Sequence, residues 1–140
     1  MTDKFVEWSP LFEIGIPKID EQHKSLAALV NEFHAIAASQ ASRDKVFSVL
    51  NRLVKYVEEH FRDEEELMGA ANYPELMKQK MEHQKLAVDI FKFAERYGHN
   101  ESELNSDVMD FLKTWLIDHI LHEDKKLETF FRGKPLPTGW

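Results

Sequence analysis

Residues 57–64 read VEEHFRDE and place His60 and Glu64 four positions apart, which brings both side chains to one side of an α-helix. On a regular helix the two residues lie roughly 40° apart around the axis and about 6 Å apart along it. An imidazole and a carboxylate so placed can reach one metal ion or two neighbouring ones. A buried hydrogen bond between the two side chains, or a helix end that is not buried, would also explain the pair.

The residues around this pair indicate that it points into a protein core. Core positions recur at alternating intervals of three and four residues, as on the buried face of an amphipathic helix. This stripe consists of Val46, Leu50, Leu53, Val57, His60, Glu64 and Leu67. A buried carboxylate is costly unless it is paired or bound to a cation. The position of Glu64 therefore favours a positively charged partner in the core.

Composition narrows the class of protein. The 140 residues suit one domain, 43% of them are hydrophobic, and the formal net charge of −7 argues against nucleic acid or an anionic membrane as main partner. No apolar run is long enough for a transmembrane helix, and the N-terminus lacks the apolar run of a signal peptide, so we expect a cytoplasmic protein. Because there is no cysteine, disulfides, iron–sulfur clusters and a catalytic thiol are excluded.

The pattern predicts helices only, since strand and hairpin signals are absent. Helices are expected over residues 18–38, 43–68, 74–97 and 100–131, with Gly69 ending the second and Pro74 beginning the third. Short connections force neighbouring helices to be antiparallel. The predicted fold is therefore an all-α, up-down-up-down four-helix bundle.

The chain is expected to form one domain over residues 1–140. The bundle takes residues 18–132, an N-terminal arm takes residues 1–17, and a C-terminal tail takes residues 133–140. Two prolines keep the arm extended, and four apolar residues anchor it to the helices: Trp8, Phe12, Ile14 and Ile16.

Each expected helix carries polar residues on its core stripe. In chain order they are His23, then His60 and Glu64, then Gln79 and His83, then His119 and Asp124. In an up-down-up-down bundle these places fall at the same end, so the side chains are expected at one depth. Four helices each placing a histidine there favour a metal site over core packing. Imidazole and carboxylate ligands suit iron, manganese or zinc, and their number favours two metal ions with carboxylate bridges.

The motifs resemble those of hemerythrins, most closely the single-domain bacteriohemerythrins. The resemblance covers nearly the whole chain and rests on three features. The opening contains Trp8, IGI at residues 14–16 and IDEQHK at residues 19–24; His60 and Glu64 form an HxxxE motif; His119 and Asp124 form an HxxxxD motif after Trp115.

The resemblance implies a non-haem centre of two iron ions, joined by an oxo or hydroxo group, that binds O2 reversibly. It implies that His23 and His60 ligate one iron, which keeps an open position for O2, and that His83 and His119 ligate the other. Glu64 and Asp124 would bridge the pair. Spacing alone would favour Glu123 over Asp124, because five residues turn a regular helix by about 140°.

Two residues depart from the family pattern. Gln79 stands where the family's HxxxH motif has its first histidine, so one ligand of the fully histidine-ligated iron is replaced. Gln79 could bind iron through its amide oxygen or hold a water in the gap. His122 stands where the family has an apolar residue lining the O2 pocket. It could ligate iron, donate a hydrogen bond to bound O2, or face solvent.

Three functions fit these residues. The first is O2 binding for storage, delivery or sensing, which makes the chain a binding protein rather than an enzyme. The second is a redox enzyme that turns over peroxide or nitric oxide. The third is a redox sensor that signals to a separate partner protein. The sequence does not indicate an oligomeric state.

Overall fold

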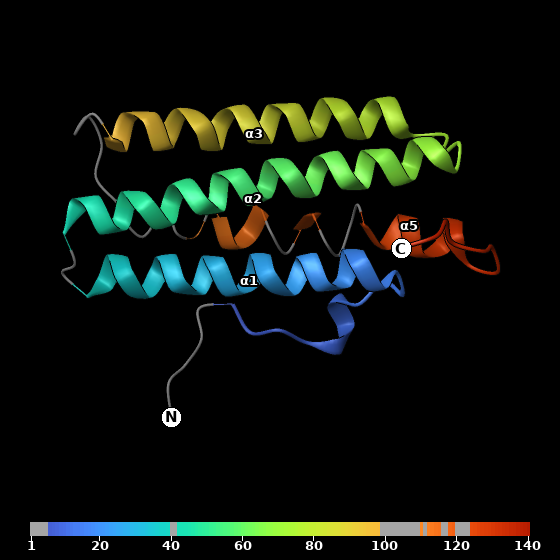
Figure 1. Cartoon of the computed structure of the whole chain (residues 1–140), viewed down its shortest axis with the longest axis horizontal. Helices are drawn as coiled ribbons and strands as arrows, with labels where there is room; N and C mark the ends of the chain where they lie inside the picture. Colours follow the sequence, from blue (N-terminus) through green and yellow to red (C-terminus); the bar gives the residue numbers. More distant parts are fainter. Residues whose placement is uncertain (1–5, 40–41, 99–109, 111, 116–117, 120–123) are drawn as a thin grey trace.

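The computed structural model describes residues 6–39, 42–98, 110, 112–115, 118–119 and 124–140. Its long helices are α1 (Pro17–Ala38), α2 (Arg43–Ala70) and α3 (Leu76–Gly98), and residues 110–119 are helical wherever they are described. The short helix α5 (Lys125–Phe131) follows. In Figure 1, α2 lies between α1 and α3 and packs against both, and neighbouring helices run in opposite directions. The predicted all-α four-helix bundle is confirmed.

Helix α1 begins at Pro17, one residue before the expected start. Proline is favoured at the first helical position because its fixed φ suits the helix and its missing N–H would be unpaired there. Asp20, in the first turn, accepts hydrogen bonds from the backbone N–H groups of Ile14 (2.8 Å) and Gly15 (3.1 Å). Gly15 has φ of 81°, and this turn directs the arm into the helix.

The N-terminal arm packs along the helices but is not fully extended. Pro10–Phe12 forms one 3₁₀ turn, capped by the Ser9 side chain. Ile14 and Ile16 are buried, and Trp8 and Phe12 are half-buried. The Asn31 side chain pairs with both the N–H and the C=O of Val6, at 2.6 and 2.7 Å.

The connection between α2 and α3 differs from the expectation. Gly69 does not end α2, which continues to Ala70, and α3 begins at Leu76 rather than Pro74. The left-handed residue is Asn72, with φ of 57°. The N–H of Tyr73 donates to the C=O of Met68 (2.9 Å) and that of Asn72 to the C=O of Gly69 (3.3 Å). These two bonds form a Schellman motif that satisfies the last carbonyls of α2.

Because Gly69 lies inside α2, Gly69→Ala is expected to stabilise the protein. A Cβ there would meet only Leu76 Cδ2, at 3.9 Å, which is ordinary van der Waals contact. Alanine in a helix is favoured over glycine by about 0.5–1 kcal/mol, so thermal denaturation should show a Tm a few degrees higher. Gly15→Ala is the control: its positive φ makes the same change unfavourable, and its Tm should fall. A lower Tm for Gly69→Ala would contradict this account of the turn.

The core consists of two apolar clusters with a polar layer between them. All seven residues of the stripe on α2 are buried, and the stripe crosses from one cluster to the other. On α2, Val57 belongs to the larger cluster and Leu67 to the smaller, and His60 and Glu64 lie between them. On α1, His23 separates Ile19 and Leu26 in the same way. Within the described residues, no helix is long and apolar enough to cross a membrane.

Candidate metal centre

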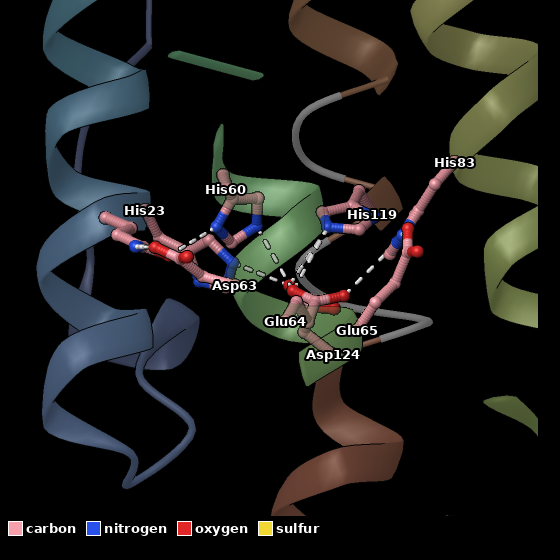
Figure 2. Close-up of polar contacts among 9 residues, drawn as sticks. His23, His60, Asp63, Glu64, Glu65, His83, His119 and Asp124 are labelled. Atoms are coloured by element: carbon pink, nitrogen blue, oxygen red, sulfur yellow. Dashed lines mark hydrogen bonds and ion pairs between the residues drawn. The ribbon is translucent and has the colours of Figure 1, made fainter. Parts of the chain in front are cut away.

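Seven polar residues lie in the layer between the two apolar clusters. Each is at most 4% exposed, and together they are His23 on α1, His60 and Glu64 on α2, Gln79 and His83 on α3, His119, and Asp124 just before α5. Figure 2 shows the histidine rings and the carboxylates of Glu64 and Asp124 pointing toward one another. The structure therefore brings together at one depth the residues that the sequence analysis singled out on each helix.

Five of these residues can each offer a ligand atom within 4.8 Å of all the others: His23, His60, Glu64, His119 and Asp124. Asp124 Oδ2 lies 2.6 Å from His23 Nε2 and 3.2 Å from His119 Nε2. Glu64 Oε2 lies 3.1 Å from His60 Nε2 and 3.6 Å from His119 Nε2. His119 thus lies between the two carboxylates.

His83 approaches the cluster from the other side of Glu64. Its Nε2 lies 3.2 Å from Glu64 Oε1, whereas His60 and His119 face Glu64 Oε2. Gln79, one turn earlier on α3, is 2% exposed. The Glu64 carboxylate therefore lies between the other four residues of this group and His83 on α3, as a bridging ligand would.

The donor atoms approach closely without forming directed hydrogen bonds. Among the described residues, the buried atoms without a hydrogen-bond partner include Nε2 of His23, His60, His83 and His119 and both oxygens of Glu64 and Asp124. Buried polar atoms are almost always hydrogen-bonded, so a cluster of exceptions requires an explanation. Lone pairs that converge on a shared centre, rather than on one another, fit a bound cation.

Side chains behind the cluster orient two of the rings. Gln22 Oε1 accepts a hydrogen bond from His60 Nδ1–H (2.8 Å), and Gln22 Nε2 donates to Asp63 Oδ2 (2.8 Å). Glu65 Oε2 lies 2.9 Å from His83 Nδ1, which donates to it. In both rings the proton on Nδ1 leaves the Nε2 lone pair facing the centre, the usual arrangement of metal-bound histidine. No pattern in the sequence singles out Gln22 or Glu65, because each supports a ring on a different helix.

Aromatic rings enclose the centre. Phe61 stacks on His83 with ring centroids 4.0 Å apart and parallel planes, and Trp115 stacks on His119 with centroids 5.8 Å apart. Phe61 and Trp115 are buried, so they exclude water and restrict the rotation of both imidazoles.

His119 and Asp124 meet although five residues separate them. Both have π-helical backbone, in which the repeating hydrogen bond joins residues i and i+5. A π-turn is wider than an α-turn, so it brings residues five apart nearer to one face than the regular-helix spacing used for the sequence suggests. Asp124 therefore lies in the cluster together with Glu64. Glu123 and His122 lie outside the described residues. The expectation that His122 enters an O2 pocket therefore stays a prediction.

The electrostatics of the cluster favour a proton on His119. Burial alone would lower the pKa of His119, but the negative charges of Asp124 and Glu64 outweigh it and hold this pKa well above its usual value. Burial would raise the pKa of Glu64, but the positive charge of His119 outweighs it and holds this pKa well below its usual value. Burial dominates at His60 and lowers its pKa.

Metal binding at neutral pH is therefore expected to release at least one proton. The raised pKa keeps His119 protonated in the metal-free protein at pH 7, and Nε2 must lose this proton to bind a metal. Apparent metal affinity should rise with pH until the pH exceeds this pKa. Calorimetric titration with Fe(II) in two buffers of different ionisation enthalpy measures the released protons. Equal apparent enthalpies in both buffers would contradict the prediction.

A known protein family with a cation-binding domain matches the part of the chain that contains this cluster. The family model described as the hemerythrin HHE cation binding domain matches residues 14–131. The chain belongs to the hemerythrin family. The match spans α1, α2, α3 and α5, and every residue of the buried cluster lies inside it. The predicted family is confirmed.

Several hemerythrin-family proteins resemble the chain over most of its length. A bacteriohemerythrin of Methylococcus capsulatus is 34% identical over 114 residues, covering 81% of this chain and 86% of the relative. A myohemerythrin of Theromyzon tessulatum is 30% identical over 128 residues, covering 91% and 92%. A crystal structure of wild-type hemerythrin superposes with a TM-score of 0.84 at 30% identity, covering 89% of this chain and 95% of that one. The bundle is therefore a hemerythrin fold with a buried cluster of histidine, glutamate and aspartate that fits a metal site.

Proposed function

We propose that this hemerythrin-family protein binds O2 reversibly at a non-haem centre of two iron ions. The observation that carries the proposal is the buried cluster of imidazole and carboxylate groups whose facing atoms lack hydrogen-bond partners. Such a ligand set, without thiolate, suits iron. The names bacteriohemerythrin and myohemerythrin of its relatives support the same function. Cluster residues that are at most 4% exposed suit binding of a small gas better than turnover of a larger substrate.

Residues of the cluster would bind the irons, and other residues would hold the ligands in place. His23, His60, His83 and His119 would hold the irons through Nε2, and Glu64 and Asp124 would bridge them. When bound, the irons would supply the electrons that O2 requires. Gln22 and Glu65 keep the Nδ1 protons of His60 and His83 in place, and Phe61 and Trp115 exclude water from the rings. A dry, fixed ligand set favours release of O2 unchanged.

The direct test is an anaerobic titration of the Fe(II)-loaded protein with O2, followed by visible absorption and then by degassing. We expect an absorption band that grows to one O2 per chain and disappears on degassing. A band that persists after degassing, or immediate irreversible oxidation, would contradict reversible binding and favour a redox enzyme or sensor. Protein that retains no iron would contradict the iron centre itself.

We also propose that Gln79 is a weak ligand or ligand neighbour on the His83 side. Its amide oxygen binds iron more weakly than an imidazole does. Gln79→His is therefore expected to slow the loss of iron to a chelator, by about 10-fold if the added imidazole acts like other supporting groups of metal sites. Gln84→His, on the exposed face of the same helix, is the matched control and should leave the rate unchanged. Equal rates in both variants would exclude Gln79 from the centre.

The alternative function is a redox enzyme or redox sensor. A surface hollow of about 350 Å³ between α2 and α3 is lined by Phe61, Glu65 and His83, so solvent approaches one side of the centre there. Peroxide or nitric oxide turnover would need such access. Repeated consumption of added hydrogen peroxide by the iron-loaded protein would favour this alternative over reversible O2 binding.

Residues 1–140 are proposed to act as one domain, since the arm and tail pack on the bundle. The backbone N–H of Lys18 donates to the C=O of Trp140 (3.2 Å), which joins the start of α1 to the end of the chain. Location in the cytoplasm stays a prediction.

A further inference from the structure

Within the part of the chain that the structure describes, one face of α3 carries most of the exposed large apolar side chains. Among the described residues, five such side chains are exposed: Leu11 (74%), Met77 (68%), Met81 (69%), Val88 (43%) and Phe91 (52%). Four of the five lie on α3, on the side away from buried Gln79 and His83. Single exposed apolar residues are ordinary, but a group aligned on one helix marks an interaction surface.

These residues follow the spacing of a coiled-coil seam. With exposed Gln84 they lie at positions 77, 81, 84, 88 and 91, which alternate by four and three. A strip of this kind is about one side chain wide and fits the apolar stripe of another helix. Methionine adapts its shape to a partner surface, and a single polar residue such as Gln84 within a seam fixes its register.

Charge indicates what kind of helix fits. Lys78, Lys85 and Lys92 recur every seven residues along one border of the strip, and all three are exposed. Residues at these border positions pair with opposite charges on a partner helix. Glu82 and Asp89 lie beside this row on the side away from the strip, so lysine is the charged residue next to the apolar side chains along this border.

We propose that the outer face of α3 is a docking surface for an amphipathic helix of a partner protein, whose apolar stripe is bordered by acidic residues. A second copy of this chain is disfavoured. Antiparallel pairing of two α3 helices would place the lysine rows against each other, and parallel pairing would place Lys80 against Lys85. A membrane surface is disfavoured because the strip is about one side chain wide and is interrupted by Gln84.

The test measures binding of two labelled helical peptides to the full-length, iron-loaded protein by fluorescence anisotropy. Both peptides have about three heptads with leucine in the stripe; one has glutamate and the other lysine at the border positions. We expect the acidic peptide to bind at least about 10-fold more tightly than the basic one and to weaken with salt. The triple variant K78E/K85E/K92E should reverse this preference.

A pair of matched variants tests the strip itself. Met81→Ser should weaken acidic-peptide binding at least about 10-fold, whereas Leu11→Ser, an equally exposed change on the arm, should leave it unchanged. Circular dichroism and iron content confirm that each variant is folded and loaded. Absence of saturable binding, equal binding of both peptides, or an unchanged Met81→Ser variant would overturn the proposal. Binding to anionic phospholipid vesicles, or dimerisation lost in Met81→Ser, would also overturn it, in favour of a membrane or a second copy.

Discussion

Glu64→Gln is expected to abolish stable metal binding while leaving the bundle folded. The Glu64 carboxylate lies within 3.6 Å of three histidine Nε2 atoms, those of His60, His83 and His119. Glutamine keeps the shape but loses the charge that balances the cations. Because Glu64 faces both sides of the centre directly, its loss should cost more than the roughly 10–100-fold in affinity that is typical of residues that only support a ligand.

Competition with a coloured chelator measures this affinity. Glu66→Gln is the matched control. Glu66 is exposed and lies two residues after Glu64, so this substitution makes the same chemical change outside the centre. The helical circular dichroism of metal-free Glu64→Gln should resemble that of the unmodified protein. If Glu64 and His60 instead form only a structural buried pair, the variant would lose stability without any change in metal affinity.

Loading with Fe(II) is expected to raise the Tm strongly under anaerobic conditions. The metal-free protein buries two carboxylates whose oxygens lack hydrogen-bond partners, and a bound cation removes this unfavourable situation. At a free metal concentration 1,000 times the Kd, binding adds about 4 kcal/mol to the free energy of unfolding. For a domain of this size that corresponds to a rise in Tm of roughly 10–20 °C.

Differential scanning calorimetry of the loaded and metal-free forms measures the shift. The Glu64→Gln variant is the control and should show little or no increase with added Fe(II). An equal rise in both proteins would mean that the metal binds elsewhere on the surface. No rise in the unmodified protein would mean that the buried cluster is a structural hydrogen-bond network.

The sequence predicted those parts of the fold that depend on periodicity. The stripe from Val46 to Leu67 determines which face of α2 is buried, and short connections determine the order of the helices. The level at which His23, His60, Glu64 and His83 meet follows from these two facts. The resemblance to hemerythrins, not the spacing, pointed to Asp124.

Other features depend on geometry that the sequence pattern does not contain. Gly69 resembled a helix end, but Asn72 takes the left-handed conformation because the Schellman bonds close there. The π-helical backbone at His119 and Asp124 changes the angle per residue, so the spacing of an ideal α-helix did not predict that Asp124 lies beside His119. Gln22 on α1 supports His60 on α2, and Glu65 on α2 supports His83 on α3. Such contacts depend on how the helices are rotated against one another.

The most direct test of the central claim is the position and number of the metal ions. Crystals of the anaerobically Fe(II)-loaded protein, measured on both sides of the iron absorption edge, would show where iron scatters anomalously. The account predicts two iron peaks inside the bundle, with Glu64 and Asp124 between them and the four histidine Nε2 atoms around them. Iron peaks only at the surface, or no iron among these residues, would contradict it.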